Sequence, residues 1–147
     1  MNVIVEPRYA PTVHPLHGVL LAGALALFLG TLLSDVAYSK TFEIQWKNFS
    51  SWMLAGALLF SGVALVCAIV GIFRPIQRAR GFVPYAIVLL VTWVVGFLNA
   101  LMHARDAWAS MPTGLVMSVI TFVLACIATW LGFRTPHVVR TTYRGSV

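Results

Sequence analysis

The sequence predicts an all-α integral membrane protein, a four-helix bundle with up-down-up-down topology. Of its 147 residues, 60% are hydrophobic and only 10% are charged, whereas about a quarter of the residues in soluble domains are charged. Four apolar stretches are each long enough to cross a hydrocarbon core, which takes roughly 20 helical residues. An even number of spans with short connections puts both termini on one side and makes consecutive helices antiparallel neighbours.

One transmembrane domain is expected to cover residues 1–147. Backbone hydrogen bonds have to be satisfied inside lipid, so each span in it is expected to be a helix. Pro15 suits the first turn of a helix, and Thr113 is a candidate N-cap. The four spans are expected at residues 15–38, 52–73, 83–104 and 113–133.

The longest connection, residues 39–51, is expected on the side of the membrane opposite the termini. Its aromatic side chains are typical of an interfacial belt or of a short amphipathic helix lying on the membrane. Those that suggest this are Phe42, Trp46 and Phe49, with Trp52 directly after them. We call the side of the membrane opposite the termini the far side.

The basic residues indicate how the bundle is oriented. Arginine and lysine accumulate next to the spans on the cytoplasmic side of membrane proteins. Seven basic residues flank the side of the termini, and three flank the far side: Lys40, Lys47 and Arg105. We therefore expect cytoplasmic tails at residues 1–14 and 134–147.

Small residues recur every four positions along the first span. Small side chains let a neighbouring helix backbone approach closely, where no hydrophobic effect drives helices together inside lipid. We expect this stripe to be the packing face of the first helix. Its members are Gly18, Ala22, Ala26, Gly30 and Ser34.

Four polar residues near the far ends of two spans need an explanation, because an ionisable residue at the centre of a membrane helix costs about 2.5 to 3.5 kcal/mol to insert. Asp35 lies near the far end of the first span. Asn99, His103 and Asp106 follow one another at spacings of four and three, which places them on one face of the third helix. Asp35 and His103 are therefore expected partners. Either a structural polar network or a site for proton handling or partner docking fits this pattern.

Three histidines lie on the side of the termini. His14 precedes Pro15, and His17 falls in the first helical turn, where the helix dipole favours the neutral imidazole that binds metals. His137 follows the fourth span on the same side. Two readings stay open. The three imidazoles bind a b-type haem or a divalent metal, or they form a polar collar that hydrogen-bonds lipid headgroups and free helix-end amides.

The sequence argues against nucleic-acid binding and against catalysis. The net charge is +6, but the basic residues lie between apolar segments instead of forming a stripe with interleaved aromatic residues. We find no P-loop, dinucleotide fingerprint, HExxH motif or GxSxG elbow. Only four carboxylates are present, and none are paired in sequence for general acid–base work. We therefore expect that the protein is not an enzyme.

Several fragments together resemble a bacterial family of membrane proteins classed as a domain of unknown function, whose members typically open with His-Pro-x-His. The fragments are HPLHGVLL, LNALMHARDAW, SMPTGLVMS and TWLGF, spread over residues 14–133. The resemblance implies a four-helix domain of the bacterial inner membrane. It also implies electron-transfer surroundings, since relatives are sometimes joined to Rieske or cytochrome c domains. The tail after Phe133 lacks the glycine-rich ending usual in that family.

Three functions fit these observations. The leading one is a scaffold or anchor in the lipid bilayer for a membrane-associated partner, such as a redox protein, or for a second copy of the chain. The second is an electron-transfer subunit that binds haem b or a metal through His14, His17 and His137. The third is a proton- or solute-conducting bundle built on Asp35, Asn99 and His103.

Overall fold

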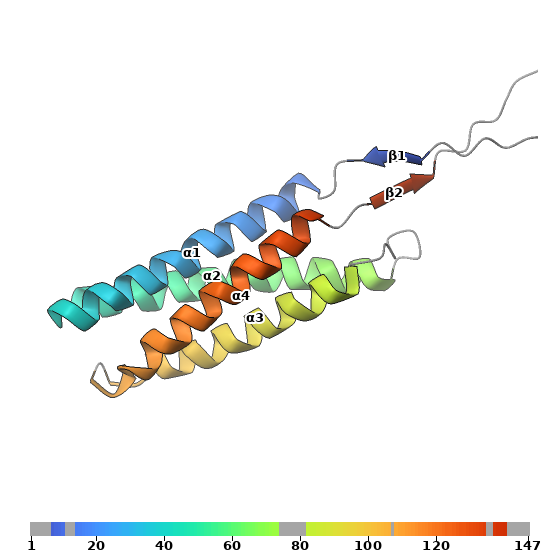
Figure 1. Cartoon of the computed structure of the whole chain (residues 1–147). Helices are drawn as coiled ribbons and strands as arrows, with labels where there is room; N and C mark the ends of the chain where they lie inside the picture. Colours follow the sequence, from blue (N-terminus) through green and yellow to red (C-terminus); the bar gives the residue numbers. More distant parts are fainter. Residues whose placement is uncertain (1–6, 11–13, 74–81, 107, 135–136, 141–147) are drawn as a thin grey trace, which may run out of the picture.

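The computed structural model describes residues 7–10, 14–73, 82–106, 108–134 and 137–140. Four long helices lie side by side in an antiparallel bundle (Figure 1). Each is long and apolar enough to cross a membrane, which confirms the predicted fold class. The helices are α1 (Pro15–Thr41), α2 (Ile44–Phe73), α3 (Phe82–His103) and α4 (Thr113–Arg134), with a short 3-10 helix, η2 (Trp108–Ser110), before α4.

The two ends of the bundle differ in what they carry. At the far end, α1 connects to α2 and α3 connects to α4; at the tail end, both termini leave the bundle (Figure 1). Two short strands, β1 (Pro7–Ala10) and β2 (His137–Arg140), pair antiparallel beyond the tail end. The sequence had predicted only tails there. The connection between α2 and α3 lies outside the described residues.

The segment expected as a long far-side connection is almost entirely helical, which corrects that expectation. Helix α1 continues to Thr41, and α2 begins at Ile44 instead of Trp52. Between them Phe42 adopts a left-handed conformation with φ of 58° and donates its N–H to the Tyr38 carbonyl, which ends α1. The charged residues in this segment suggested an exit from the membrane. A helix forms its own backbone hydrogen bonds inside and outside lipid, however, so neither helix has to end where charged residues begin.

Helices α1 and α2 alternate small and large residues along their contact. A Cβ added at Gly23 would lie 2.8 Å from the Phe60 ring, and one added at Gly56 would lie 3.2 Å from Leu27. Gly30 faces Met53 in the same way. Each glycine therefore receives a large side chain from the other helix.

The small-residue stripe predicted on α1 is only partly a packing face. Ala22 and Ala26 are exposed, Gly18 and Gly30 are half-buried, and only Ser34 is buried. A helix turns about 100° per residue, so a strict period of four drifts by about 40° at each step and winds off the contact face. The actual face alternates steps of four and three, through Gly23, Leu27 and Gly30.

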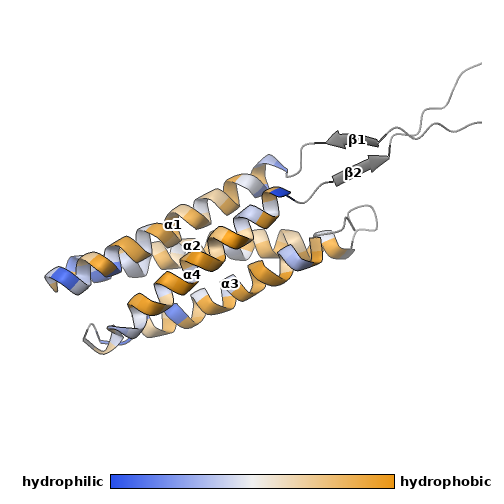
Figure 2. Cartoon of the chain, viewed as in Figure 1, coloured by the Kyte–Doolittle hydropathy of each residue, from blue (hydrophilic) through white to orange (hydrophobic). Residues whose placement is uncertain are grey.

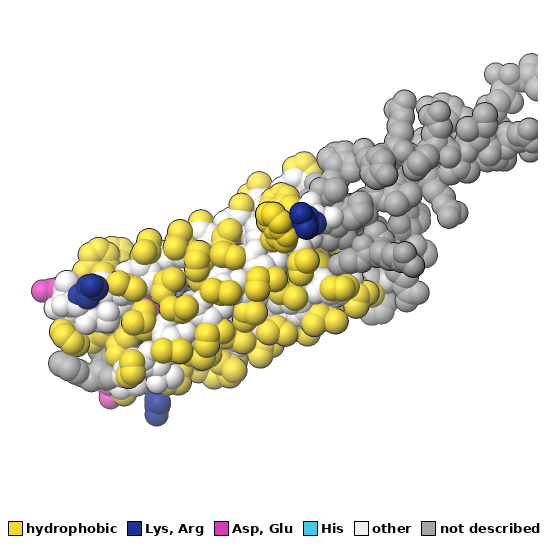
Figure 3. All heavy atoms as spheres, viewed as in Figure 1, with side chains coloured by type: hydrophobic (Ala, Val, Ile, Leu, Met, Phe, Trp, Pro, Cys, Tyr) yellow, Lys and Arg dark blue, Asp and Glu magenta, His cyan; other side chains and the backbone are white. Residues whose placement is uncertain are grey.

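Apolar side chains fill the middle of the bundle and also cover its outside. One buried cluster near the tail end centres on Leu21, Tyr85 and Leu89, and a second, towards the far end, centres on Phe28 and Leu54. On the outside, apolar residues cover the length of the helices, and the hydrophilic residues gather near the ends (Figures 2 and 3). This distribution is that of a protein whose surrounding solvent is lipid.

Candidate functional site: a buried polar cluster at the far end

All four helices contribute a polar side chain to one buried cluster at the far end. Asp35 comes from α1, Ser50 from α2, Asn99 and His103 from α3, and Ser118 from α4. We call these five residues the polar cluster. The side chains of Asp35 and His103 are 0% and 1% exposed. A buried charge is costly unless it is paired and hydrogen-bonded, so the contacts within the cluster decide what it can do.

The Asp35 carboxylate accepts hydrogen bonds from three other helices. Ser50 Oγ donates to Oδ1 over 2.5 Å, and Ser118 Oγ donates to Oδ2 over 2.6 Å. His103 Nε2 lies 2.9 Å from Oδ1 and 3.1 Å from Oδ2. Both carboxylate oxygens are therefore satisfied without water, and Asp35 links the ends of all four helices.

Both ring nitrogens of His103 face acceptors. Nδ1 lies 3.0 Å from the backbone carbonyl of Asn99, one turn earlier in α3, and Nε2 faces Asp35. A carbonyl and a carboxylate can only accept, so each contact needs a proton. A hydrogen bond to Asn99 requires a proton on Nδ1, and a hydrogen bond to Asp35 requires a second proton between Nε2 and the carboxylate.

Ser50, His103 and Asp35 do not have the geometry of a catalytic triad. In a triad the serine and the aspartate bind opposite nitrogens of the imidazole. Here Ser50 Oγ and the Asp35 carboxylate both approach Nε2, at 3.0 and 2.9 Å. Ser50 is also 0% exposed. These contacts orient the Asp35, Ser50 and His103 side chains relative to one another.

Asn99 carries the cluster one step deeper into the bundle. Its Nδ2 donates to Ser118 Oγ over 2.9 Å, and that hydroxyl in turn donates a hydrogen bond to Asp35 Oδ2. The Oδ1 atom of Asn99 is buried and has no hydrogen-bond partner among the described residues. This unused acceptor marks the inner limit of the cluster.

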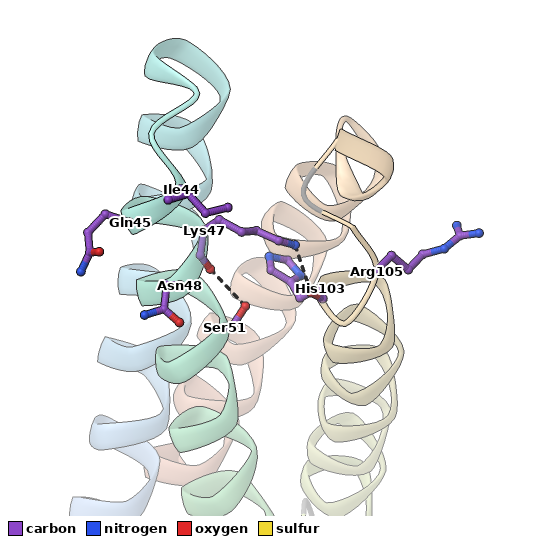
Figure 4. A pocket seen from close by; sticks show the side chains of 7 residues that line it. All are labelled: Ile44, Gln45, Lys47, Asn48, Ser51, His103 and Arg105. Atoms are coloured by element: carbon purple, nitrogen blue, oxygen red, sulfur yellow. Dashed lines mark hydrogen bonds between the residues drawn. The ribbon is translucent and has the colours of Figure 1, made fainter.

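An open pocket of about 380 Å³ lies beside the cluster at the far end. Lys47 extends from α2 across this pocket to α3, where its Nζ donates to the His103 carbonyl over 3.1 Å (Figure 4). Arg105 points outward in the same view. His103 is one of the lining residues, so the pocket lies next to the polar cluster. The lining consists of Ile44, Gln45, Lys47, Asn48, Ser51, His103 and Arg105.

The structure brings three of the four far-side residues from the sequence analysis together. Asp35, Asn99 and His103 are in the cluster, but Asp106 is exposed. Its inclusion required α3 to continue, whereas α3 ends at His103, so the expected spacing along one face no longer applies. Sequence reasoning missed Ser50, Ser118 and Lys47. Lys47 gave no signal in the sequence, because residues 39–51 were expected to form a connection, whereas α2 begins at Ile44.

The histidines of the tail end are placed differently. His14 caps α1, because its Nδ1 accepts from the Leu16 N–H over 3.3 Å. His17 Nε2 lies 2.5 Å from the hydroxyl of Tyr85 on α3. His137 lies opposite Ala10 in the strand pair, and its side chain is outside the described part. In that part no group of three or more histidine, cysteine, aspartate and glutamate side chains is arranged to hold a metal ion.

Comparison with known proteins identifies a family for this chain. The family described as "Predicted membrane protein (DUF2231)" matches residues 13–142. Neither a curated protein nor a solved structure matches the chain.

Proposed function

We propose that this chain, which belongs to the DUF2231 family, a domain of unknown function, is a proton-binding membrane protein. Because the family has no known function, the proposal rests on the polar side chains of the chain itself. The observation that carries this proposal is the buried pair of Asp35 and His103, 2.9 Å apart, with acceptors on both imidazole nitrogens. Ionisable pairs inside membrane proteins commonly serve proton or ion handling.

Loss of the shared proton would change the packing of the bundle. The carboxylate would then face a lone pair of the imidazole, and a net negative charge would lie between α1 and α3. The charged group that approaches from α2 is Lys47, while α4 contributes the uncharged Ser118 and Gly114. Proton binding therefore tightens the far end, and proton release loosens it.

We propose that the proton enters and leaves on the far side only. His103 lines the far-end pocket, whereas the two apolar clusters fill the bundle between the polar cluster and the tail end. The hydroxyls in that region, among them Thr31 and Thr92, donate to carbonyls of their own helices. This arrangement favours a one-sided proton site over a conduit through the membrane.

Nitrogen NMR of the histidines in the reconstituted protein tests the proposal. We expect the His103 signals to change reversibly when the buffer is varied from mildly acidic to mildly alkaline, because histidine is the side chain that exchanges protons in this range. In Asp35→Asn the response should differ from that of the parent protein, because the partner carboxylate is gone. A His103 signal that stays constant over this range, or titrates identically in Asp35→Asn, would show that the cluster is purely structural.

A second candidate function is anchoring of a membrane-associated partner, such as a redox protein. Exposed aromatic residues at the far end favour it: Phe42, Trp46, Phe49 and Trp52. A photocrosslinking residue at Trp52 should then give a specific adduct in native membranes, while the same residue at Trp130, exposed at the tail end, should not. Identical adducts at both positions would contradict it. Haem or metal binding by the tail-end histidines and self-association stay predictions.

We further propose a binding role without catalysis, in the bacterial inner membrane with both termini cytoplasmic. The excess of basic residues beside the termini supports this orientation, which places the polar cluster on the periplasmic side. An alkaline phosphatase fusion at Val147 should be inactive, because that enzyme needs the periplasm to fold. An active fusion would reverse the orientation.

A further inference from the structure

The far-end pocket has a polar lining that contains two cations. These are Lys47 and Arg105; Gln45 and Asn48 add amide groups, Ser51 donates its hydroxyl to the Lys47 carbonyl, and none of the described lining residues is a carboxylate. Its volume of about 380 Å³ lies within the range of small-molecule sites. A pocket with this lining suits a group that only accepts hydrogen bonds and carries negative charge.

Lys47 is the strongest of these donors. The residue is only 6% exposed, although lysine is rarely buried without a partner. Its ammonium group carries three protons, and one of them binds the His103 carbonyl. The remaining protons are held at a fixed place at the pocket wall, so an anion there would meet a preorganised donor.

The backbone adds to the positive potential. Helix α2 begins at Ile44, so Gln45, Lys47 and Asn48 belong to its first turns, where free N–H groups and the helix dipole favour anions. Nearby negative charge is limited. Asp35 is paired with His103, and Glu43 and Asp106 do not line the pocket.

From these observations we infer that the pocket binds a phosphate group, held by Lys47 and the first turns of α2, with Arg105 adding positive charge at the pocket edge. The phosphate can belong to an anionic lipid headgroup or be free in solution. Ile44 gives the pocket an apolar edge, which suits a headgroup whose chains lie along the bundle. The inference is tested separately from the proposed function, because its experiment measures phosphate binding and not proton exchange at His103.

Calorimetric titration of the full-length protein in a neutral detergent tests this inference. One arm uses inorganic phosphate and the other uses soluble dihexanoyl phosphatidylglycerol, with chloride at equal ionic strength in both. We expect saturable binding in at least one arm. Binding in the lipid arm alone identifies a headgroup site, and binding of inorganic phosphate identifies a site for the free anion. Absence of saturable binding in both arms overturns the inference.

Three variants locate the site. Lys47→Met should weaken binding about tenfold, the worth of one hydrogen bond to a charged group. Arg105→Gln should weaken phosphate binding about threefold. Because Arg105 is exposed, this variant should fold normally, so it tests the site even if Lys47→Met disturbs the fold. Lys40→Gln removes an equal charge from an exposed residue outside the pocket and should change affinity less than twofold. Equal weakening in Arg105→Gln and Lys40→Gln would mean unspecific attraction and would overturn the inference.

Discussion

The same two helices are joined by a histidine at both ends of the bundle, with different partners. At the far end His103 of α3 binds Asp35 of α1, and at the tail end His17 of α1 binds Tyr85 of α3. The far-end pair is ionisable, fully buried and connected to α2 and α4. The tail-end pair joins a half-buried histidine to a phenol. The two histidine contacts between α1 and α3 should therefore differ in how much free energy of unfolding is lost when each is removed.

Burial sets the size of that difference. A charged group left without its partner in a buried site cannot recover its hydration, whereas a half-buried histidine can bind water or a lipid headgroup. The far-end link should therefore hold the bundle strongly and respond to protons. The loss of the tail-end link should lower the free energy of unfolding by less than the loss of the far-end link.

The largest effect is expected for Asp35→Asn. It removes the carboxylate but keeps its shape, and breaking a buried pair in this way costs about 3 kcal/mol in the free energy of unfolding. Unfolding in mixed detergent micelles containing sodium dodecyl sulfate measures this quantity. Asp106→Asn is the matched control, since Asp106 is exposed beyond α3. Similar losses in the two variants would break the distinction between buried and exposed polar groups at the far end.

The sequence predicted the ionisable core of the cluster but not its supports. Asp35, Asn99 and His103 stand out because such residues are rare in apolar helices. Ser50 and Ser118 do not stand out, since a serine in a membrane helix often binds only its own backbone, as Ser61 does here. Which serines face a carboxylate depends on the rotation of each helix, and only the packing fixes that rotation.

The number and order of the helices could also be predicted, whereas helix rotation and helix ends could not. Hydropathy identifies spans because lipid excludes unpaired backbone groups. It says nothing about where a helix stops once outside lipid, so α2 was expected to start at Trp52 and starts at Ile44. The small-residue stripe failed for a related reason. Its period differed from the helical one, and the contact face of α1 runs through Gly23 and Gly30.

A substitution midway along α1 tests whether the bundle depends on the close contact between α1 and α2. Gly23→Leu inserts a side chain where even a Cβ would lie 2.8 Å from Phe60, and such overpacking typically costs about 1 to 3 kcal/mol. Ala26→Leu is the control, because Ala26 is exposed on the same helix and should stay within about 0.5 kcal/mol. Unfolding in mixed micelles gives both values. A larger loss for Ala26→Leu would restore the stripe that the sequence suggested.

The smallest effect is expected at the tail end, for Tyr85→Phe. The change removes a hydroxyl that binds His17 Nε2 over 2.5 Å and keeps the ring, which is buried against α1 and α4. The loss should be about 1 kcal/mol, the net worth of one hydrogen bond, because the half-buried His17 can find another partner.

His17→Ala separates the two members of that bond. It leaves the Tyr85 hydroxyl without its hydrogen-bond partner in a buried position, so it should cost about 1 to 3 kcal/mol, more than Tyr85→Phe. In the double variant nothing polar is left unpaired, and its loss should be smaller than the sum of the two single losses. If the losses simply add, the hydrogen bond contributes nothing to the tail end. The far-end pair would then be the only one of the two histidine links that stabilises the bundle.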